Sequence, residues 1–476
     1  MILSCQNIEK AFLEKQVLKN CSFHIEDYEK AAIVGLNGAG KTTLLRIIVG
    51  QLEPDGGVVA FAKDKTFGYL AQDSAVNSDN TIYEELLSVK QHLLDLENQI
   101  RQAELSMKQL SGDALEDLMQ KYADLTHRFE MENGYAYKSE LTGVLKGLGF
   151  TEDEFQKPVS TLSGGQKTRV ALGKLLLQKP DLIILDEPTN HLDMSSISWL
   201  ETYLLNYKGS VLIVSHDRYF LDRVVQRSID FTSGEAEFYS GNYSFYVVER
   251  QRRFDEQLKK YEKDQAKLQQ LTEAAAKLHL WAFMGNDKLH KRAFSIEKRM
   301  EKLETTARPT EARKLNVHFT AQEFRGDDVL TMAGLGKRYG ARTLFHDLDL
   351  TVTGGERIAL IGDNGAGKTT FLRLVMNEET PDTGWVQRGP SVRTAYLPQI
   401  VRFAVPERSM LDTMLYECKC TPQEARDQLA AYGFCGEDVL KPVSALSGGE
   451  LSRLRLCMLM RREINFLILD EPTNHL

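Results

Sequence analysis

Short apolar runs alternate with segments of helical pattern along the chain. The run AAIVG at 31–35 predicts a buried strand, and the following KTTLLRIIVG carries apolar residues at helical spacing. The run LIILD at 182–186 predicts a central parallel strand, because a strand buried on both faces is apolar without alternation. Strands that alternate with helices indicate an α/β fold.

Two longer stretches have a purely helical pattern. Residues 81–134 contain IYEELLSVKQHLLDLENQI and ALEDLMQKYADLTHRFEMEN, separated by SGD at 111–113, and predict an antiparallel helical hairpin that projects from its domain. Residues 243–323 contain ERQRRFDEQLKKYEKDQAKLQQLTEAAAKL, which predicts a helix of about 36 residues and on the order of 50 Å. A second helix is predicted at 289–305.

The strand and helix pattern occurs twice. GLNGAGKTT at 35–43 recurs as GDNGAGKTT at 362–370, an offset of 327 residues, whereas LSGGQ from Leu162 and LSGGE from Leu446 are 284 residues apart. The 43-residue difference places an insertion, the predicted hairpin, in the first copy. A repeat this long is a whole domain, so the chain is a tandem duplication and not a solenoid.

This organisation predicts three parts. We expect a first domain at 1–242 with a helical arm at about 81–134, a helical hairpin linker at 243–323, and a second domain at 324–476. The second copy ends in EPTNHL, the hexapeptide found at 187–192, and nothing that matches the later part of the first copy follows. We therefore expect the second domain to be incomplete at its C-terminus, as in a truncated gene or a fragment.

Composition and charge narrow the class of protein. Hydrophobic content of 42% with no apolar run near the roughly 18 residues of a membrane span predicts a soluble, cytoplasmic protein. The six cysteines lack metal-ligand spacing and are expected to be free thiols. The net charge of the chain is −8, yet residues 277–302 contain seven Lys or Arg and only three Asp or Glu. Residues 81–134 contain five Lys or Arg and eleven Asp or Glu. The linker tip is thus a candidate phosphate binder, and the arm a candidate protein contact.

The glycine-rich repeats have the chemistry of phosphate loops. In G-x-x-x-x-G-K-T the glycines turn backbone N–H groups toward phosphates, Lys41 reaches the β- and γ-phosphates, and Thr42 holds Mg²⁺. Asp186 would hold Mg²⁺ through water, and Glu187 would polarise the attacking water. The loop residues are Gly35, Asn37, Gly38, Ala39, Gly40, Lys41, Thr42 and Thr43, and in the second copy Gly362, Asn364, Gly365, Ala366, Gly367, Lys368, Thr369 and Thr370; Asp470 and Glu471 repeat the carboxylates.

These elements resemble the nucleotide-binding domain of ATP-binding-cassette ATPases, most specifically at TLSGGQKTR, 161–169. The resemblance implies ATP hydrolysis with ATP and Mg²⁺, two ATP molecules held head to tail between the copies, and a signature helix that contacts the γ-phosphate on the opposite copy. The implied signature residues are Ser163, Gly164, Gly165 and Gln166, and Ser447, Gly448, Gly449 and Glu450.

The same resemblance assigns further residues. Phe12 and Tyr339 each lie 29 residues before the loop lysine and would stack on adenine. Gln72 and Gln399 would join Mg²⁺ and the attacking water. Asp193 would cross the interface between the copies, and His216 would sense the γ-phosphate beside the catalytic residues Glu187 and Glu471.

Tandem cassettes without membrane segments, an arm in the first copy and a charged helical linker closely resemble the ABC-F family, as do EPTNHLD and GNYSFY at 241–246. The resemblance implies a monomer that closes on ATP, binds the ribosome near its exit site, points the linker tip toward transfer RNA and the peptidyl-transferase centre, and leaves on hydrolysis. Aromatic residues interleave with basic ones at the tip, as in proteins that hold structured RNA. The candidate RNA contacts are Lys288, His290, Lys291, Arg292, Lys298 and Arg299.

The function of the protein stays open between several alternatives at this point. The protein could be a translation factor or an antibiotic-resistance factor that protects the ribosome. It could instead be the ATPase subunit of a transporter, or an ATPase that binds DNA junctions. We also expect the first site to keep more activity than the second, which lacks a counterpart of His216.

Overall fold

The computed structural model describes residues 1–12, 15–35, 38–72, 76–108, 111–190, 192–232, 235–282, 287–301, 328–340, 342–363, 365–399, 401–461 and 464–471, with every side chain in these ranges except those of 15, 281–282, 287–291, 299 and 301. The chain divides into two compact units, one formed by Met1–Phe238 with Leu315–Leu476 and the other by Tyr239–Lys314. The two copies of the repeat belong to the first unit, and most of the predicted linker belongs to the second.

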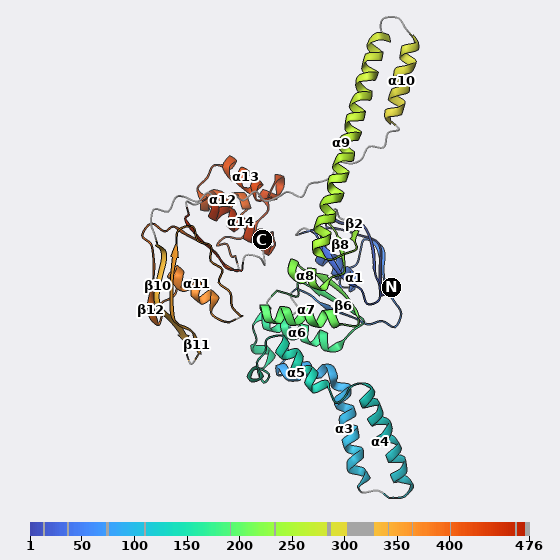
Figure 1. Ribbon diagram of the computed structural model, residues 1–476, viewed down its shortest axis with the longest axis vertical. Helices are drawn as coiled ribbons and strands as arrows, with labels where there is room; N and C mark the ends of the chain where they lie inside the picture. Colours follow the sequence, from blue (N-terminus) through green and yellow to red (C-terminus); the bar gives the residue numbers. More distant parts are fainter. Residues whose placement is uncertain are drawn as a thin grey trace. The chain divides into compact units, whose positions relative to one another are not determined.

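Two sheets form the first copy (Figure 1). The larger sheet has the order β5-β6-β7-β3-β8-β9, and its first five strands are parallel. The smaller sheet is antiparallel, with the order β2-β1-β4. The strands are β1 (Leu3–Phe12), β2 (Lys15–Ile25), β3 (Lys30–Val34), β4 (Gly56–Phe61), β5 (Phe67–Leu70), β6 (Leu182–Asp186), β7 (Ser210–Val214), β8 (Arg227–Asp230) and β9 (Glu237–Tyr239).

One hydrophobic core joins the two sheets. Helix α1 (Lys41–Ile48) contributes Leu44, Leu45 and Ile48 to a cluster that also contains buried side chains of both sheets. The predicted central strands are confirmed, since every residue of β3 and β6 is buried. The helix that follows the glycine-rich loop is therefore held by packing on both sides. The other helices of this copy, apart from the arm, are α5 (Tyr137–Gly147), α6 (Gly164–Gln178), α7 (Met194–Asn206) and α8 (Arg218–Val224), with 3₁₀ turns at Glu152–Glu154 and Val159–Thr161.

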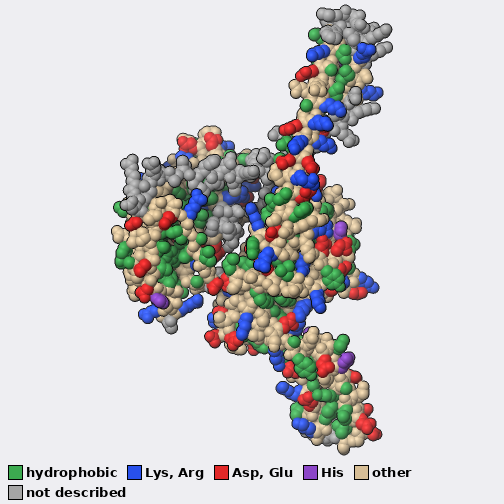
Figure 2. Space-filling view, in the orientation of Figure 1, with side chains coloured by type: hydrophobic (Ala, Val, Ile, Leu, Met, Phe, Trp, Pro, Cys, Tyr) green, Lys and Arg blue, Asp and Glu red, His purple; other side chains and the backbone are tan. Residues whose placement is uncertain are grey.

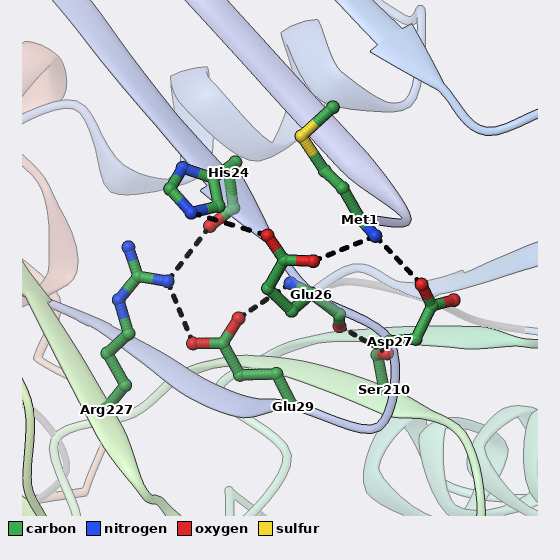
Figure 3. A network of polar contacts seen from close by, with 7 residues as sticks. All are labelled: Met1, His24, Glu26, Asp27, Glu29, Ser210 and Arg227. Atoms are coloured by element: carbon green, nitrogen blue, oxygen red, sulfur yellow. Dashed lines mark hydrogen bonds and ion pairs between the residues drawn. The ribbon is translucent and has the colours of Figure 1, made fainter.

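A polar network ties the strand starts of the larger sheet to β2 (Figure 3). Arg227 Nη1 donates to Glu29 Oε1 at 2.9 Å and to the His24 carbonyl at 3.3 Å. Ser210 Oγ donates to the Glu26 carbonyl at 2.9 Å, and Glu26 N donates to Glu29 Oε2 at 2.7 Å. The turn between β2 and β3 is thus bonded to the first residues of β7 and β8, which fixes the two sheets at this edge.

The predicted helical arm is present in the first copy (Figure 1). It consists of α2 (Ile82–Leu87), a 3₁₀ turn at Ser88–Lys90, α3 (Gln91–Met107) and α4 (Asp113–Met131). The 3₁₀ turn interrupts the first segment, which the sequence had indicated as one helix. Helices α3 and α4 form the hairpin around a small core that contains Leu93, Leu96, Leu125 and Phe129.

The second copy repeats part of this arrangement. Its antiparallel sheet has the order β11-β10-β12, and β13 pairs with β14 in parallel. Helix α11 follows the second glycine-rich loop and packs in the same cluster as β10. The elements are β10 (Asp328–Tyr339), β11 (Arg342–Thr353), α11 (Lys368–Met376), β12 (Thr383–Arg388), β13 (Thr394–Leu397), α12 (Met410–Cys418), α13 (Pro422–Ala431), α14 (Gly448–Met460) and β14 (Phe466–Leu469), with 3₁₀ turns at Gly436–Leu440 and Val443–Ala445.

The counterpart of β3 in the second copy does not form a strand. Residues 356–363 are in no strand, although RIALIG at 357–362 repeats the apolar pattern of AAIVG. Ile358, Leu360 and Ile361 are 55%, 46% and 81% exposed. In the first copy the corresponding Ala31, Ile33 and Val34 are 0%, 0% and 5% exposed between β7 and β8. Among the described residues no strand pairs with 356–363, so these side chains stay outside a core.

The second compact unit is a helical hairpin. Helix α9 (Tyr243–Ala282) has 40 residues, more than predicted, and spans about 60 Å. Helix α10 (Asp287–Glu301) begins two residues before the predicted start, and 302–305 lie outside the described residues. His279 Nε2 lies 2.9 Å from Glu297 Oε1, and its ring packs edge-on against Phe294, so α10 lies against α9 (Figure 1). In the described part of the chain, no helix has the length and apolar character of a membrane span.

Candidate active sites

The first glycine-rich loop folds around Lys41. Gly40 precedes α1 with φ 92°, and Lys41 Nζ donates a hydrogen bond to the Gly35 carbonyl at 2.8 Å. A Cβ on Gly40 would lie 2.4 Å from Val17 Cγ1, so the turn requires glycine. The loop leads into the N-terminus of α1, where backbone N–H groups and the helix dipole attract anions. The loop can therefore hold phosphate groups.

The second loop has the same construction. Gly367 precedes α11 with φ 99°, and Lys368 Nζ donates to the carbonyls of Gly362 at 2.6 Å and Asp363 at 3.0 Å. The predicted loop residues Asn37 and Asn364 lie outside the described residues. The other predicted residues occupy the two turns and the first turns of the helices: Gly35, Gly38, Ala39, Gly40, Lys41, Thr42, Thr43, Gly362, Gly365, Ala366, Gly367, Lys368, Thr369 and Thr370.

Glu187 and Glu471 have a left-handed backbone, with φ of 52° and 48°. Residues other than glycine rarely adopt this conformation, and it clusters at functional sites. Asp186 is the last residue of β6, and Asp470 directly follows β14. In the first copy, Glu187 N donates to the Val214 carbonyl at 2.8 Å, which holds the turn against β7. Each copy thus places an Asp-Glu pair at the carboxyl end of a parallel strand.

Charge and burial set the protonation of Glu187. Burial raises the pKa of Glu187 to about 7, and the neighbouring Asp186 carboxylate adds to the rise. The His216 backbone N–H and the Lys41 ammonium act in the opposite direction. Burial also lowers the pKa of Lys41, against the attraction of Glu187, Asp186 and Asp230. Glu187 is therefore poised to gain or lose a proton near neutral pH, as a general base requires.

His216 lies against Glu187. Its backbone N donates to Glu187 Oε2 at 3.3 Å, and its Nε2 lies 3.5 Å from Glu187 Oε1. Burial lowers the pKa of His216 to about 4, and the Lys41 charge lowers it further in the same direction. The imidazole is thus neutral at pH 7, so the contact between Nε2 and Glu187 is not an ion pair.

The residues predicted to hold a metal ion are one aspartate, one threonine and one glutamine in each copy. Thr369 Oγ1 donates to Asp470 Oδ2 at 3.3 Å. Gln399 Nε2 donates to Glu471 Oε2 at 2.7 Å, whereas Gln72 is exposed. No group of three or more His, Cys, Asp or Glu among the described residues could hold a metal. A single carboxylate with hydroxyl and amide oxygens, completed by phosphates, suits Mg²⁺.

The two signature sequences form capping boxes at helix starts. Ser163 Oγ accepts from Gln166 N at 3.3 Å, and Ser163 N donates to Gln166 Oε1 at 3.1 Å. Ser447 and Glu450 repeat this pairing at the start of α14, where Ser447 N donates to Glu450 Oε2 at 2.8 Å. The predicted residues Gly164, Gly165, Gly448 and Gly449 form the first turns of these helices.

Asp193 caps α7 in this structure. Its Oδ1 accepts from Ser196 N at 2.8 Å and from Ser195 Oγ at 2.9 Å. These hydrogen bonds lower the pKa of Asp193 against the effect of burial, and the Arg169 guanidinium lowers it further. Asp193 is therefore held as a charged side chain beside its own helix.

The predicted adenine contacts lie in the antiparallel sheets. Phe12 is half-exposed at the end of β1, with Lys10 Nζ 5.9 Å from its ring. Tyr339 is half-exposed at the end of β10, with Lys337 Nζ 5.5 Å from its ring, and its hydroxyl donates to Glu379. Both aromatic rings are thus available to a planar ligand at equivalent positions.

All six residues that are predicted to contact RNA belong to α10. Arg292 and Lys298 are exposed. The side chains of Lys288, His290, Lys291 and Arg299 lie outside the described side chains. Both basic and acidic side chains are visible along α9, so the long helix has mixed charge below the tip (Figure 2).

Two side chains near the sites were missed by sequence reasoning. Asp230 is buried at the carboxyl end of β8 and attracts the Lys41 ammonium. Tyr396 donates a hydrogen bond to Asp470. A signal for Tyr396 was present, because YLPQ repeats YLAQ at the offset of the two lysines. Asp230 had only the weaker signal of a carboxylate at the end of a short strand.

Known protein families match three segments of the chain. A model described as ABC transporter matches residues 18–190 and 345–474, and a second model with the same description matches 229–319. The first two segments contain both glycine-rich loops and both Asp-Glu pairs, and the third contains α9 and α10.

Relatives match over nearly the whole chain. The Bacillus subtilis protein YdiF is 41% identical over 100% of this chain and 74% of its own length. "ABC transporter F family member 2" of Arabidopsis thaliana is 34% identical over 99% of this chain and 70% of its own. "Energy-dependent translational throttle protein EttA" of Mycobacterium tuberculosis is 34% identical over 100% of this chain and 84% of its own.

Proposed function

Since the chain belongs to the ABC-F family of ATP-binding-cassette proteins and is therefore an ATPase, we propose that it acts on translation by binding the ribosome in its ATP-bound state. Hydrolysis would then release it. The name of the relative EttA, a translational throttle, supports this action. The observation that carries the proposal is the helical hairpin of α9 and α10, which lies in the chain between two ATP-binding copies and has a basic tip.

Each copy supplies the groups that ATP requires. Lys41 and Lys368 begin the helices that follow the loops, and their ammonium groups, now bonded to loop carbonyls, would contact the β- and γ-phosphates. The half-exposed rings of Phe12 and Tyr339 would stack on adenine. The proposed metal ligands are Thr42, Gln72 and Asp186 in the first copy and Thr369, Gln399 and Asp470 in the second. Mg²⁺, when bound, neutralises phosphate charge.

Glu187 is the proposed general base of the first site. Its carboxylate would accept a proton from the attacking water. With a pKa of about 7, it is a stronger base than an ordinary glutamate and is still partly ionised at neutral pH. The His216 backbone N–H would hold the carboxylate in place, and the single N–H of the neutral imidazole would be left to donate to the γ-phosphate. Glu471 would take the same role in the second copy.

We propose that ATP closes the two copies on each other within one chain. The capped helix starts at Ser163 and Ser447 would each contact the γ-phosphate bound to the opposite copy. Asp193 would lie at that interface. Closure of this kind makes the bound shape depend on ATP, so ribosome binding would depend on ATP as well.

The hairpin tip is the proposed RNA contact and the arm a proposed protein contact. The tip residues 277–302 have an excess of basic charge, which neutralises phosphates. The arm residues 81–134 have an excess of acidic charge, which would repel RNA and attract basic proteins. The proposed site of action is the ribosome, in the cytoplasm.

Sedimentation through sucrose with purified ribosomes tests the proposal. The Glu187→Gln, Glu471→Gln double variant keeps the phosphate loops and loses both carboxylates, so we expect it to stay ATP-bound and to sediment with ribosomes only when ATP is present. If it binds ATP but never sediments with ribosomes, the proposal fails, and membranes and branched DNA become the partners to test.

A charge series then tests the tip. In the same double variant, Lys288→Glu, Lys291→Glu and Arg292→Glu together should weaken ribosome binding by about tenfold or more and reduce its salt dependence. The matched control changes Lys259, Lys260 and Lys263 of α9 to glutamate, which alters the same amount of charge away from the tip. Equal losses in both sets would contradict a specific role for the tip.

A further inference from the structure

Tyr396 contacts the aspartate of the second site from the neighbouring strand. Its hydroxyl donates to Asp470 Oδ2 at 3.2 Å, and Thr369 Oγ1 donates to the same oxygen at 3.3 Å. Asp470 is buried, and the Tyr396 ring packs in the cluster that contains Ile468. Two donors on one oxygen fix the rotation of the carboxylate. Neither of these two bonds uses Oδ1, which would then be the oxygen offered to a metal ion or its water.

The strand register explains this contact. In the parallel pair of β13 and β14, Tyr396 lies opposite Ile468. Asp470 is two residues beyond Ile468, and side chains two apart on a strand share one face of the sheet. A diagonal neighbour of this kind lies within reach of a long aromatic side chain. The hydroxyl therefore reaches Asp470 because of backbone pairing, without any special loop.

The first copy has the same register. Tyr69 lies opposite Ile184 in the pair of β5 and β6, and Asp186 is two residues beyond Ile184. The Tyr69 hydroxyl is buried and has no hydrogen-bond partner among the described residues. Burial raises the pKa of Tyr69 to about 12, and the nearby Asp186 carboxylate contributes to the rise. A buried hydroxyl without a hydrogen-bond partner is costly. The Tyr69 hydroxyl would therefore be stabilised by a hydrogen bond to the nearby Asp186 carboxylate.

We propose that Tyr396 and Tyr69 are positioning residues that orient the metal-binding aspartates through a hydrogen bond from the phenol. The bond is formed in the second copy, and binding of the metal with nucleotide would form it in the first. This inference rests on the proposed metal sites. Hydrogen bonds to a metal ligand hold it in its binding orientation, and their loss typically weakens metal affinity about 10-fold to 100-fold.

The test replaces each tyrosine by phenylalanine, which keeps the packed ring and removes only the donor. The variants are Tyr396→Phe, Tyr69→Phe and the double change in the full chain. Tyr416→Phe is the matched control, because Tyr416 is 67% exposed on α12. Electron paramagnetic resonance measures Mn²⁺ binding by the protein saturated with ADP. Fluorescent ADP in EDTA measures nucleotide binding without metal.

We expect Tyr396→Phe to weaken Mn²⁺ binding at one of the two sites by about tenfold and Tyr69→Phe to weaken the other by a similar factor. Nucleotide binding in EDTA should stay within about twofold of the unchanged protein, and Tyr416→Phe should change neither measurement. If the tyrosine side chain acted only through packing, the substitution would instead change the affinity for ADP both with and without metal.

Mn²⁺ affinity that is unchanged in both phenylalanine variants would overturn the inference. So would a parallel loss of nucleotide binding in EDTA. A loss confined to Tyr396→Phe would retain the assignment for the second copy and overturn it for the first. If the unchanged protein binds ADP but no Mn²⁺, the proposed metal sites themselves fail, and the inference fails with them.

Discussion

Burial reverses the usual protonation of the Glu187 and His216 pair. A histidine normally titrates near pH 6.5 and a glutamate near 4.3. Here the pKa of His216 falls to about 4 and that of Glu187 rises to about 7. Loss of solvent is the main cause for both. The Lys41 charge lowers the pKa of His216 further, and the Asp186 carboxylate raises that of Glu187 further, against the opposing effects of the His216 backbone N–H and of Lys41 on Glu187. Glu187 is therefore the group that titrates in the physiological range.

The pH dependence of hydrolysis at the first site should report Glu187. In the Glu471→Gln variant, ATP turnover should rise with pH and reach half its maximum near pH 7, because only the ionised carboxylate accepts a proton. The activity is lost as pH falls through 7, since a raised pKa keeps the acid protonated below that point. Turnover rates between about pH 5.5 and 8.5 check this, and a midpoint near 4 would contradict it.

The two catalytic glutamates should contribute unequally. Glu187 lies against His216, while Glu471 accepts a hydrogen bond from Gln399 at 2.7 Å, which competes with water for that oxygen. We expect Glu187→Gln to lower single-turnover ATP hydrolysis by about 100-fold or more and Glu471→Gln to lower it less. Each variant is the control for the other. Comparable rates from the two variants would rule out the asymmetry.

Several helices are specified by local sequence at their ends. Thr81 with Glu84, Ser163 with Gln166, and Ser447 with Glu450 form capping boxes at the starts of α2, α6 and α14. Each box satisfies two backbone N–H groups that a helix start leaves open. In contrast, α3 and α4 of the arm depend on contact with each other, through the small core around Phe129.

Removing the Phe129 ring should loosen the arm alone. Phe129→Ala removes a buried ring from a cluster that contains Leu93, Leu96 and Leu125, at a cost of about 3–5 kcal/mol to the local structure. We expect faster hydrogen exchange across α3 and α4 with unchanged ATP turnover. Met131→Ala is the matched control, because Met131 is 73% exposed at the end of α4. Retained protection in Phe129→Ala would contradict the role of this core.

Similar sequence patterns have different structures in the two copies of the repeat. AAIVG forms the buried strand β3, and RIALIG lies outside any strand with Ile358, Leu360 and Ile361 exposed. A parallel strand is held by hydrogen bonds to both neighbours and by helices on both faces. In the first copy β7 and β8 supply those neighbours. Exposed apolar residues of this kind promote association with other surfaces.

Hydrogen exchange should separate the two segments. Amides of 358–361 should exchange faster than amides of 31–34 by about 100-fold or more, because the latter are bonded within a central strand. The comparison is internal, since both segments lie in one protein under one condition. Equal protection would show that 356–363 has strand partners in solution.

The residue pattern was enough to predict the α/β class, the duplication, the arm and the helical hairpin. The apolar runs at 31–35 and 182–186 and the helical periodicity of the arm and hairpin are local features, and the predicted strands are present as β3 and β6. Phosphate loops are also local, because their glycines and lysine lie within one turn. The 3₁₀ turn at Ser88–Lys90 escaped prediction because no strong helix breaker marks it.

Three-dimensional packing was needed for the properties that depend on neighbours distant in sequence. The pKa of Glu187 depends on burial and on His216, 29 residues away. Tyr396 and Asp470 are 74 residues apart in the chain, and their contact depends on the pairing of β13 with β14. Whether RIALIG forms a buried strand depends on the presence of neighbouring strands that can pair with it. Local periodicity carries no information about which side chains meet across a sheet, because strand order and register arise only when the chain packs.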